Sequence, residues 1–497
     1  MREPAGFLPA LNAAALLRSD LPPLERDRFA SGLLELVAQG ARVASLFGTP
    51  RAQGGVEIIA LLAHDARGKL RVGSGVVTDG VWPSLTPVRP ELHLFERELA
   101  EQLGLEVPGH PWLEPVRSPM ATPAPPVQEL EYERVGGEEI HEVAVGPVHA
   151  GVIEPGHFRF ECDGERVLQL EISLGYQHRG VERALVAGPE KRRLHYAETL
   201  AGDTTIAHAT AYCEIVEALA GTRVPPRGLA LRGIALELER LANHTGDLGA
   251  LAGDVGFLPT AAVCGRVRGD WLNLSADLCG NRFGRGFVRP GGVRFDLEAG
   301  RVERIVERLQ AALADLAPSV ELLWDTPSVL SRFEDAGPIE AATARALGAV
   351  GPTARACGLE CDVRATFPSG IYQFEQIPIS TWRSGDVLAR AYVRWLEIER
   401  SAAFVRAQLH ALPEGPISSA AGSLVADRMG VALEEGWRGE VCHVAWTDRV
   451  GRLAAYKVVD ASFHNWSALA VAMRGQPISD FPLCNKSFNL SYCGFDL

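Results

Sequence analysis

Hydrophobic residues recur at every third or fourth position in four long stretches of the chain, a spacing that predicts amphipathic helices. The stretches are Leu194–Leu219, Leu229–Leu251, Arg301–Leu323 and Gly385–Leu412. In the second of them, Ile234, Leu238 and Leu241 fall on one helical face. The pattern therefore predicts a mainly helical structure over most of the region after residue 190.

Before residue 118 the pattern is different, because short hydrophobic runs replace the helical period. Ala41–Phe47, Val56–Ala63 and Lys69–Val77 are predicted strands. Pro90–Leu105 follows them as a predicted amphipathic helix. Strands followed by a helix predict a small α+β domain over residues 1–117.

Four prolines fall within the eleven residues Ser118–Gln128, SPMATPAPPVQ. Such a segment fits neither a helix interior nor a central strand, so we expect a linker over residues 118–140. A second domain over residues 141–497 then begins with strand-like Glu142–His149 and a β-hairpin of His157–Cys162 and Val167–Glu171. The last 60 residues return to short strands and loops. The predicted fold class is α+β, with a small α+β domain before a mainly helical one.

Composition and charge exclude several classes of protein. Lys and Arg number 49 and Asp and Glu number 62, so the net charge is −13; without a basic block, we expect no nucleic-acid partner. No apolar run reaches the roughly 20 residues that span a bilayer, and the start does not resemble a signal peptide. Nine cysteines without a CxxC pair indicate reduced thiols in the cytoplasm. The chain also lacks the GxSxG, GxxxxGK[ST] and GxGxxG motifs of hydrolases and nucleotide-binding enzymes.

Eight stretches together resemble a known family. They are His93–Arg117, Gly146–Glu165, Leu174–Glu182 (LGYQHRGVE), Glu237–Gly249 (ELERLANHTGDLG), Arg289–Val293, Gly351–Arg364, Glu435–Glu440 and Ser462–Trp466. In this order they are similar to a domain like the 30-kDa subunit of respiratory complex I joined to one like its 49-kDa subunit. Such a fusion is typical of formate hydrogenlyase large subunits and membrane-bound (group 4) nickel–iron hydrogenases. The resemblance runs from about residue 40 to the C-terminus.

The resemblance implies a place in a larger complex. It implies a small iron–sulfur subunit as one partner, which carries the iron–sulfur cluster, and antiporter-like membrane-arm subunits as others. Electron transfer in such a complex is coupled to ion translocation. The expected location is cytoplasmic, peripheral to the membrane face. NAD is expected to bind another subunit of the complex.

The family's nickel–iron centre needs four thiolates, which suit a soft metal site. Its CGxCxxAH motif aligns with AGDTTIAH at Ala201–His208, and its C-terminal CxxC aligns within SFNLSYCG at Ser487–Gly494. The four ligand positions then fall on Ala201, Thr204, Ser491 and Gly494. Cys493 is one residue out of register. We therefore expect this chain to bind no metal and no cofactor of its own.

A quinone is the alternative cofactor that the resemblance offers. The family's first hairpin histidine aligns with His149, but its quinone-contacting histidine aligns with Ile153 and its tyrosine with Gly202. His157 lies four residues beyond Ile153. An altered quinone-type pocket that uses His149 and His157 stays open.

The ionisable residues around the aligned cavity are the remaining candidates. Glu182, in RGVE, matches the family's active-site glutamate and is a candidate proton relay; the alternative is an ion pair with Arg179 or Arg183. Asp203 is a candidate to hydrogen-bond water in a remodelled cavity, where Thr204 is also polar. His208 is a cavity candidate, and a packed core histidine is the alternative.

Three further residues have expected structural roles. Asp362 and Arg364 form a DxR element and are expected to make an internal ion pair, and Arg179 is grouped with them. Lys486 lies in an unusually polar C-terminal stretch. We expect it to pair with Glu182 or Asp203 in a segment that seals the aligned cavity.

Three functions follow. The first is a large subunit of an ion-translocating oxidoreductase complex without its own nickel–iron centre. The second is a catalytically inactive scaffold or coupling subunit. The third is an NADH dehydrogenase C/D-type subunit that reduces a quinone in an altered pocket. Nickel bound per chain discriminates the first two from a true hydrogenase.

Overall fold

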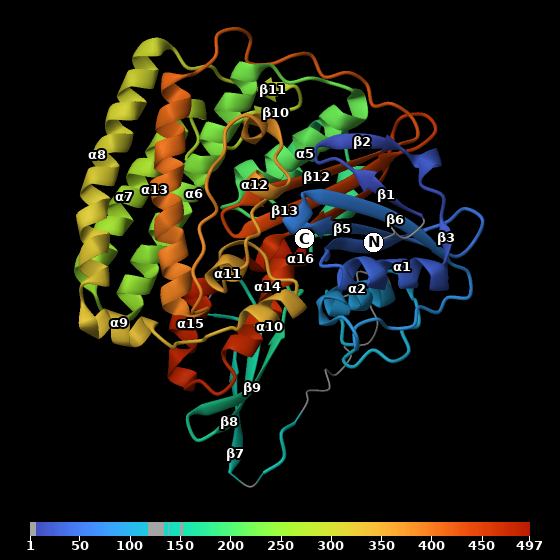
Figure 1. Cartoon of the computed structure of the whole chain (residues 1–497), viewed down its shortest axis with the longest axis horizontal. Helices are drawn as coiled ribbons and strands as arrows, with labels where there is room; N and C mark the ends of the chain where they lie inside the picture. Colours follow the sequence, from blue (N-terminus) through green and yellow to red (C-terminus); the bar gives the residue numbers. More distant parts are fainter. Residues whose placement is uncertain (1–5, 118–133, 138, 150–152) are drawn as a thin grey trace.

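The computed structural model describes residues 6–117, 134–137, 139–149 and 153–497. The fold is α+β, as predicted. A layer of long helices, a central sheet and an N-terminal sheet lie side by side, and a small three-stranded sheet projects from them (Figure 1). The expected linker Ser118–Gln128 lies outside the described residues.

The N-terminal part is a sheet covered by two helices. Its elements are β1 (Phe7–Ala10), β2 (Ala14–Leu17), β3 (Leu24–Glu25), α1 (Arg26–Ala38), β4 (Arg42–Pro50), β5 (Val56–His64), β6 (Lys69–Val77) and α2 (His93–Leu103). The strand order is β1-β6-β5-β4, and β3 pairs with β6. Strands β4–β6 were predicted within a few residues, because their hydrophobic runs are nearly all buried.

The central sheet joins the two ends of the chain. It contains β12 (Arg428–Gly436), β13 (Gly439–Thr447) and β14 (Leu453–Val459). The N-terminal strand β2 completes it in the order β14-β13-β12-β2. Because β2 pairs with β12 over residues 14–17, a strand from the N-terminal part is built into the sheet of the C-terminal part.

The helical part packs against this sheet. Its longer helices are α4 (Glu190–Glu198), α5 (Thr205–Ala220), α6 (Pro226–Asp254), α7 (Leu258–Cys279), α8 (Ala299–Trp324) and α13 (Val387–His410). Shorter elements are α3 (Val181–Ala187), β10 (Val288–Arg289), β11 (Gly292–Val293), α9 (Pro327–Phe333), α10 (Ala341–Ala346), α11 (Gly351–Ala356) and α12 (Val363–Thr366). Helix α5 lies against β12, and α6 packs between α7 and α13 (Figure 1).

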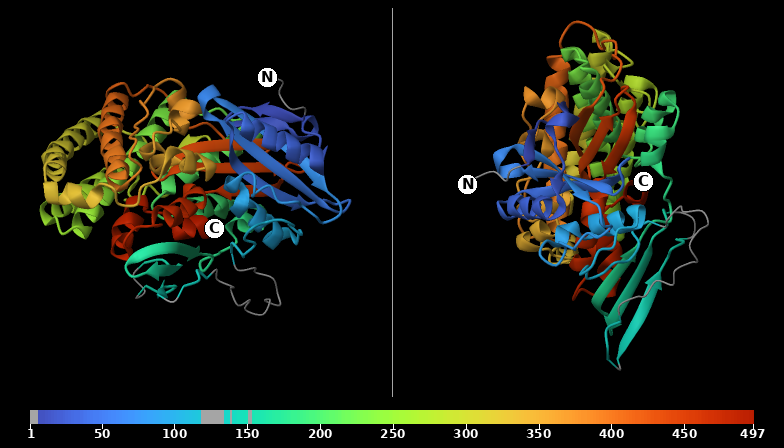
Figure 2. Two further views of the ribbon diagram at one scale, coloured as in Figure 1. Left: turned by 60° about the horizontal axis from the view of Figure 1, so that its bottom comes forward. Right: turned by 90° about the vertical axis from the view of Figure 1, so that its right-hand side faces the viewer.

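The three-stranded sheet consists of β7 (Ile140–Val145), β8 (His157–Asp163) and β9 (Arg166–Ser173) and points away from the body of the molecule (Figure 2). The end of the chain packs beside it as α14 (Ala461–Ala472), α15 (Phe481–Phe488) and α16 (Tyr492–Asp496). The expectation of strands and loops at the C-terminus is thus correct only as far as Val459.

One helix prediction needs a correction that matters for the site. The helix expected over Leu194–Leu219 is two helices, α4 and α5, separated by residues 199–204. Hydrophobic spacing continues across this break, but Gly202 and Asp203 interrupt the helix. The break brings Ala201 and Thr204 to the start of α5.

Candidate functional site

The start of α5 and the C-terminal segment meet at the tip of the β12–β13 hairpin. Arg438, in the RGE element at this tip, lies between them. Its guanidinium donates to both carboxylate oxygens of Asp203, at 2.5 and 2.8 Å, and to the Thr204 hydroxyl at 3.1 Å. Its Nε donates to the carbonyl oxygen of Asn489. The structure therefore brings the two halves of the aligned metal site together, with an arginine between them.

The residues at the four aligned positions do not fit a nickel–iron group. Ala201 and Gly494 have no donor side chain, and hydroxyls are poor ligands for a soft metal. A Cβ on Gly494 would lie 2.8 to 3.0 Å from the carboxyl atoms of Asp460, so a longer side chain has no room there. Cys493 Sγ is 3.4 Å from Ser491 Oγ and is a single thiol. In the described part of the chain, no three His, Cys, Asp or Glu side chains are grouped to hold a metal ion.

A chain of buried hydrogen bonds leads away from this place. Asp460 lies beside Gly494, and its Oδ2 is 3.0 Å from Nε2 of His208. The other ring nitrogen of His208 is 3.1 Å from Nε2 of His443, whose Nδ1 is 2.8 Å from the Tyr456 hydroxyl. Each of these side chains is at least 95% buried. The chain links helix α5 to strands β13 and β14.

The four groups can carry a proton along the chain. Burial lowers the pKa of His443 well below its usual range, and burial raises the pKa of Tyr456 well above its usual range. For Asp460, burial opposes ionisation, but the hydrogen bond from His208 lowers the pKa below its usual range. With Asp460 as acceptor, His208, His443 and Tyr456 each donate toward it; these tautomers are assigned from the bonding pattern. When each group passes its proton to the next group toward Asp460, a proton that enters at Tyr456 can therefore leave at Asp460.

Glu239 of α6 closes the other side of the site. Its carboxylate accepts the backbone N–H groups of Ile206 and Ala207 at 2.7 and 3.4 Å and so caps the start of α5. Burial raises the pKa of Glu239 to about 8, and nearby Asp203 adds to the effect. A cavity of about 10 Å³ lies between Glu239 and Asp203. The remodelled cavity expected at Asp203 is therefore no larger than about one water molecule.

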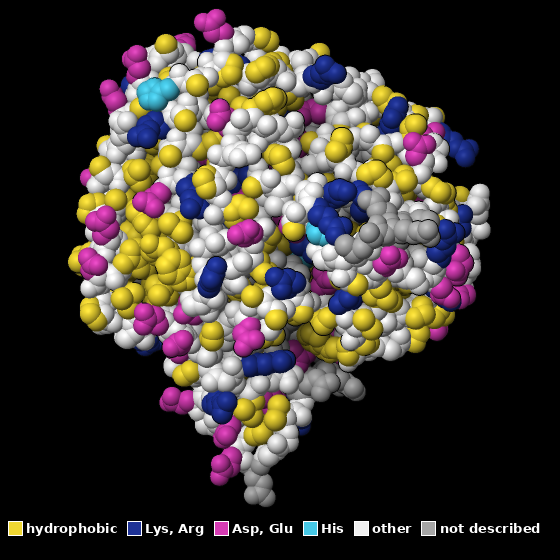
Figure 3. All heavy atoms as spheres, viewed as in Figure 1, with side chains coloured by type: hydrophobic (Ala, Val, Ile, Leu, Met, Phe, Trp, Pro, Cys, Tyr) yellow, Lys and Arg dark blue, Asp and Glu magenta, His cyan; other side chains and the backbone are white. Residues whose placement is uncertain are grey.

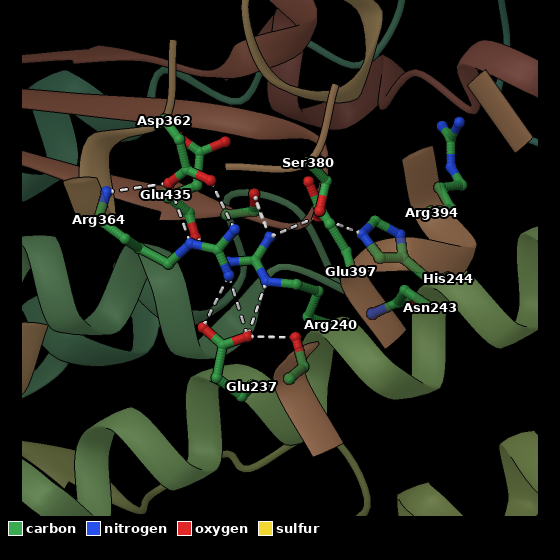
Figure 4. Close-up of polar contacts among 12 residues, drawn as sticks. Glu237, Arg240, Asn243, His244, Asp362, Arg364, Ser380, Arg394, Glu397 and Glu435 are labelled. Atoms are coloured by element: carbon green, nitrogen blue, oxygen red, sulfur yellow. Dashed lines mark hydrogen bonds and ion pairs between the residues drawn. The ribbon is translucent and has the colours of Figure 1, made fainter. Parts of the chain in front are cut away.

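A second buried cluster holds the hairpin in place. Figure 4 shows Glu237 and Arg240 of α6, Asp362 and Arg364 at α12, and Glu397 of α13 pointing toward one another. Arg364 lies 2.6 Å from Asp362, as expected for an internal pair, and 3.1 Å from Glu237. Arg240 donates to Glu237 and to the carbonyl oxygens of residues 435 and 436. The cluster thus fixes the strand that leads to Arg438.

The cluster contains more carboxyl groups than arginine cations. The cations Arg240, Arg355 and Arg364 face the carboxyls of Glu237, Asp362, Glu397 and Glu435. Although burial opposes ionisation, Arg240 and Arg364 lower the pKa of Glu237 to about 2. Burial raises the pKa of Glu435 to about 7. His244 bonds Glu397 at 2.8 Å, and burial lowers its pKa to about 4. Glu435 is therefore the member of this cluster that titrates near neutral pH.

Glu182 lies outside this place and has a different partner from the one expected. Its Oε1 is 3.0 Å from Lys457 Nζ and accepts the backbone N–H of Val458; the expected pair with Arg179 or Arg183 is wrong. Lys457 also contacts Glu98 of α2 at 2.7 Å. Arg179 instead donates to carbonyl oxygens of residues 199, 200 and 493. Glu182 thus takes part in an ionic link between the two parts of the chain.

The remaining candidates are dispersed. His149 Nε2 is 2.9 Å from the carbonyl oxygen of Gly156, and His157 starts β8 in the projecting sheet. Neither histidine lines the cavities of about 440 and 630 Å³ that border the N-terminal part. Lys486 pairs with Asp254 at the end of α6, so its expected pairing with Glu182 or Asp203 is wrong.

Sequence reasoning missed Arg438, Asp460, His443 and Glu239. The RGE element was identified as a family block, which was a signal for Arg438. Glu239 likewise lies in the family block Glu237–Gly249. No local pattern marks His443 or Asp460, because His208 lies 235 residues from His443 and 252 residues from Asp460.

Comparison with known proteins identifies relatives over most of the chain. Residues 254–430 match "Respiratory-chain NADH dehydrogenase, 49 Kd subunit" and residues 34–129 match "Respiratory-chain NADH dehydrogenase, 30 Kd subunit". The chain is 31% identical to the carbon monoxide-induced hydrogenase of Rhodospirillum rubrum, over 70% of this chain and 97% of that protein. It is 30% identical to formate hydrogenlyase subunit 5 of Escherichia coli (strain K12), over 83% of this chain and 76% of that protein. It is 29% identical to membrane-bound hydrogenase subunit alpha of Pyrococcus furiosus, over 70% and 85%.

None of the helices in the described ranges is both long and apolar enough to cross a bilayer.

Proposed function

The chain joins a 30-kDa-like part to a 49-kDa-like part and belongs to the complex I-type family of formate hydrogenlyase subunit 5 and carbon monoxide-induced hydrogenase, and from this we propose its role. It is the large subunit of a membrane-associated oxidoreductase complex that couples electron transfer to ion translocation. It works without a nickel–iron centre of its own. Its contribution is to hold and move protons beside the place where relatives with four thiolates would bind metal.

The ion pair between Arg438 and Asp203 carries this proposal. It lies at the point where the start of α5 meets the C-terminal segment. The two side chains are hydrogen-bonded to each other, and Arg438 also donates to Thr204 and to the carbonyl oxygen of Asn489. A guanidinium held in this way keeps its positive charge, since two carboxylate oxygens and a carbonyl oxygen accept from it. With Asp203 held by Arg438 and no thiolate at the four aligned positions, this point lacks the ligands that a soft metal needs.

The hydrogen-bond chain from Asp460 to Tyr456 supports a working role over a purely structural one. A scaffold needs packing at these positions, and buried polar groups in line are costly to keep. Four titratable side chains joined end to end are what a proton path requires. The chain's own residues thus supply proton binding and positioning next to the aligned cavity.

Partner subunits are part of the proposal. The name of the Pyrococcus furiosus relative describes it as a subunit of a membrane-bound hydrogenase. We propose a small iron–sulfur subunit as the electron-carrying partner and antiporter-like membrane subunits as the ion path. Hydrophobic side chains gather over the α8–α13 side of the molecule (Figure 3), where Leu322 is 48% exposed. A patch of this kind supports burial against another subunit.

A quinone-reducing role has less support. Ile153, at the family's quinone-contacting position, is 54% exposed, and Gly202 offers no hydrogen bond from a side chain. No cavity described above joins His149 and His157. The inactive scaffold is the stronger alternative, and it makes different predictions for the proton path.

Nickel content is the decisive measurement. The complex is purified with its small subunit, and nickel and iron per chain are measured by plasma mass spectrometry. We expect no nickel, with iron accounted for by the clusters of the small subunit. About one nickel per chain would overturn the proposal and make the protein a true hydrogenase subunit.

A variant of the proton path separates the proposed role from a scaffold. His443→Gln breaks the chain in its middle, and it is expected to slow turnover of the purified complex and increase its solvent deuterium isotope effect. His410→Gln, at the exposed C-terminal end of α13, is the matched control. Equal turnover of the two variants in an intact complex would favour the scaffold.

A further inference from the structure

A small polar cavity lies behind β12, away from the Arg438 site. Its volume is about 20 Å³, and it is enclosed by α5, α6, β12 and the segment from Ser369 to Tyr372. Thr210 and Glu214 of α5 and Glu434 of β12 line it, and each is at least 95% buried. A cavity of this size holds about one water molecule. Two carboxyl groups therefore face a space that has room for one small guest.

The hydrogen bonds around this cavity are incomplete. Glu214 Oε2 and Thr210 Oγ1 are buried atoms without a hydrogen-bond partner in the described structure. The two residues are four positions apart on α5 and so lie on the same face. Glu434 Oε1 accepts only the backbone N–H of Glu435, at 3.2 Å. Buried polar groups in proteins are nearly always paired, so the cavity requires an additional donor.

The charges around the cavity do not neutralise the two carboxyls. The charged and titratable groups that face the pair are Cys213 and Glu217 on α5, Arg232, Glu237 and Arg240 on α6, Arg364 on α12, Tyr372, and Glu435 on β12. Arg232 is bound to Glu217 at 2.5 and 3.1 Å and to the carbonyl oxygens of residues 289 and 292. Arg240 and Arg364 are bound to Glu237. Each of these three arginines is thus already paired with an acid other than Glu214 and Glu434.

We propose that Glu214 and Glu434 form a buried proton-binding site, in which the two carboxyls share protons through one water molecule held by Thr210. The added protons supply the missing donors and remove the unpaired negative charge. The site concerns this chain's own carboxyls, so it does not depend on the proposed function or on whether the complex moves protons.

Two observations favour protons over a metal cation. Burial raises the pKa of Glu214 to about 7, and burial together with the neighbouring Glu214 raises that of Glu434 well above its usual range. Hard cations such as calcium and magnesium take six or more oxygen ligands. A space for one water between two carboxyls and a threonine does not supply that number.

Infrared spectroscopy of the full chain tests the site. The absorption of protonated carboxyl groups is compared at pH 7 between the wild type and the double variant Glu214→Gln/Glu434→Gln. We expect the double variant to lose the absorption of at least one carboxyl group. Glu217→Gln, which removes a carboxylate already paired with Arg232, is the matched control and is expected to lose none. An unchanged spectrum in the double variant would overturn the proposal.

Two further measurements decide the remaining outcomes. Glutamine resembles a protonated glutamate in shape, so Glu434→Gln is expected to fold and to weaken the loss of stability from pH 5 to pH 8. If the stability of Glu434→Gln kept the full pH dependence of the wild type, the two carboxyls would not share protons. The melting temperature is also compared in sodium chloride and in choline chloride at one ionic strength. A higher melting temperature in sodium chloride for the wild type, but not for Glu434→Gln, would show that the site binds a metal cation. That result would overturn the proposal.

Discussion

The carboxylate of Asp203 accepts two hydrogen bonds from the guanidinium of Arg438, at 2.5 and 2.8 Å, although 235 residues separate them in the chain. The pair joins the break between α4 and α5 to the tip of the β12–β13 hairpin. Arg438 is 6% exposed and Asp203 34%. A cation this well buried depends on its acid, because an unpaired buried charge is strongly destabilising.

Removal of the acid from this pair is expected to destabilise the fold. Asp203→Asn leaves Arg438 with neutral acceptors alone, so the free energy of unfolding should fall by about 2 kcal/mol, less than for a fully buried pair because Asp203 is partly exposed. Urea unfolding of the purified chain measures the loss. The double variant with Arg438→Met closes a thermodynamic cycle and should show a favourable interaction energy between the two sites.

An exposed pair in the same sheet region provides the control. Arg452 and Asp448 lie 3.1 Å apart, and the arginine side chain is 79% exposed. Arg452→Ala should change the free energy of unfolding by no more than about 0.5 kcal/mol, as for surface ion pairs in general. Equal losses from Asp203→Asn and Arg452→Ala would show that Arg438 does not depend on its acid.

Gly494 should be intolerant of a larger side chain. A Cβ there would lie 2.8 Å from Cγ of Asp460, which His208 and the backbone N–H of Ser462 hold in place. Gly494→Ala is expected to lower the free energy of unfolding by about 1 to 3 kcal/mol through overpacking. Thermal unfolding measures it. The same contact predicts that cysteines placed at all four aligned positions will not restore a metal site while Asp460 remains.

Gly265 of α7 is the matched control for this substitution. A Cβ there meets nothing within 4 Å. Because alanine is a better helix former than glycine, Gly265→Ala should raise stability by up to about 1 kcal/mol. The two substitutions are therefore expected to change the free energy of unfolding in opposite directions. If Gly494→Ala raised stability, Asp460 would be free to move.

Stability should fall as pH rises through the range in which Glu239 titrates. Burial raises the pKa of Glu239 to about 8, from an ordinary value of 4.5. The folded chain therefore keeps a proton that the unfolded chain releases, and each pH unit between these values lowers the free energy of unfolding by about 1.4 kcal/mol. Glu239→Gln, which resembles the protonated acid, should gain stability relative to the wild type from pH 5 to pH 8.

Glu237, two residues before Glu239 on α6, tests whether the raised pKa belongs to Glu239. Arg240 and Arg364 lower its pKa to about 2 against the effect of burial, so it stays ionised throughout this pH range. Glu237→Gln should therefore destabilise the chain by a similar amount at pH 5 and pH 8. Denaturant unfolding at both pH values distinguishes the two variants. A pH-independent difference between Glu239→Gln and the wild type would contradict the raised pKa.

Much of the fold was predictable, because local spacing determines it. The runs of β4–β6 and the periods of α6, α8 and α13 are each contained within one element. The site was predictable only in part. Ala201, Thr204, Ser491 and Gly494 were located by alignment, but hydrophobic spacing passes without interruption over the break at residues 199–204. The partner of Asp203 comes from a distant hairpin, and no periodicity reports a contact of that kind.

The packing of the N-terminal part against the rest of the chain is expected to depend on Lys457. Its ammonium lies 2.7 Å from Glu98 of α2 and 3.0 Å from Glu182 of α3, and it is 4% exposed. Lys457→Met leaves two acids short of a cation, so the free energy of unfolding should fall by about 3 kcal/mol, with faster hydrogen exchange in α2 and β14. Lys486→Met, which breaks a more exposed pair with Asp254, should cost less than about 1 kcal/mol. Equal effects of the two variants would mean that the buried lysine does not hold the N-terminal part in place.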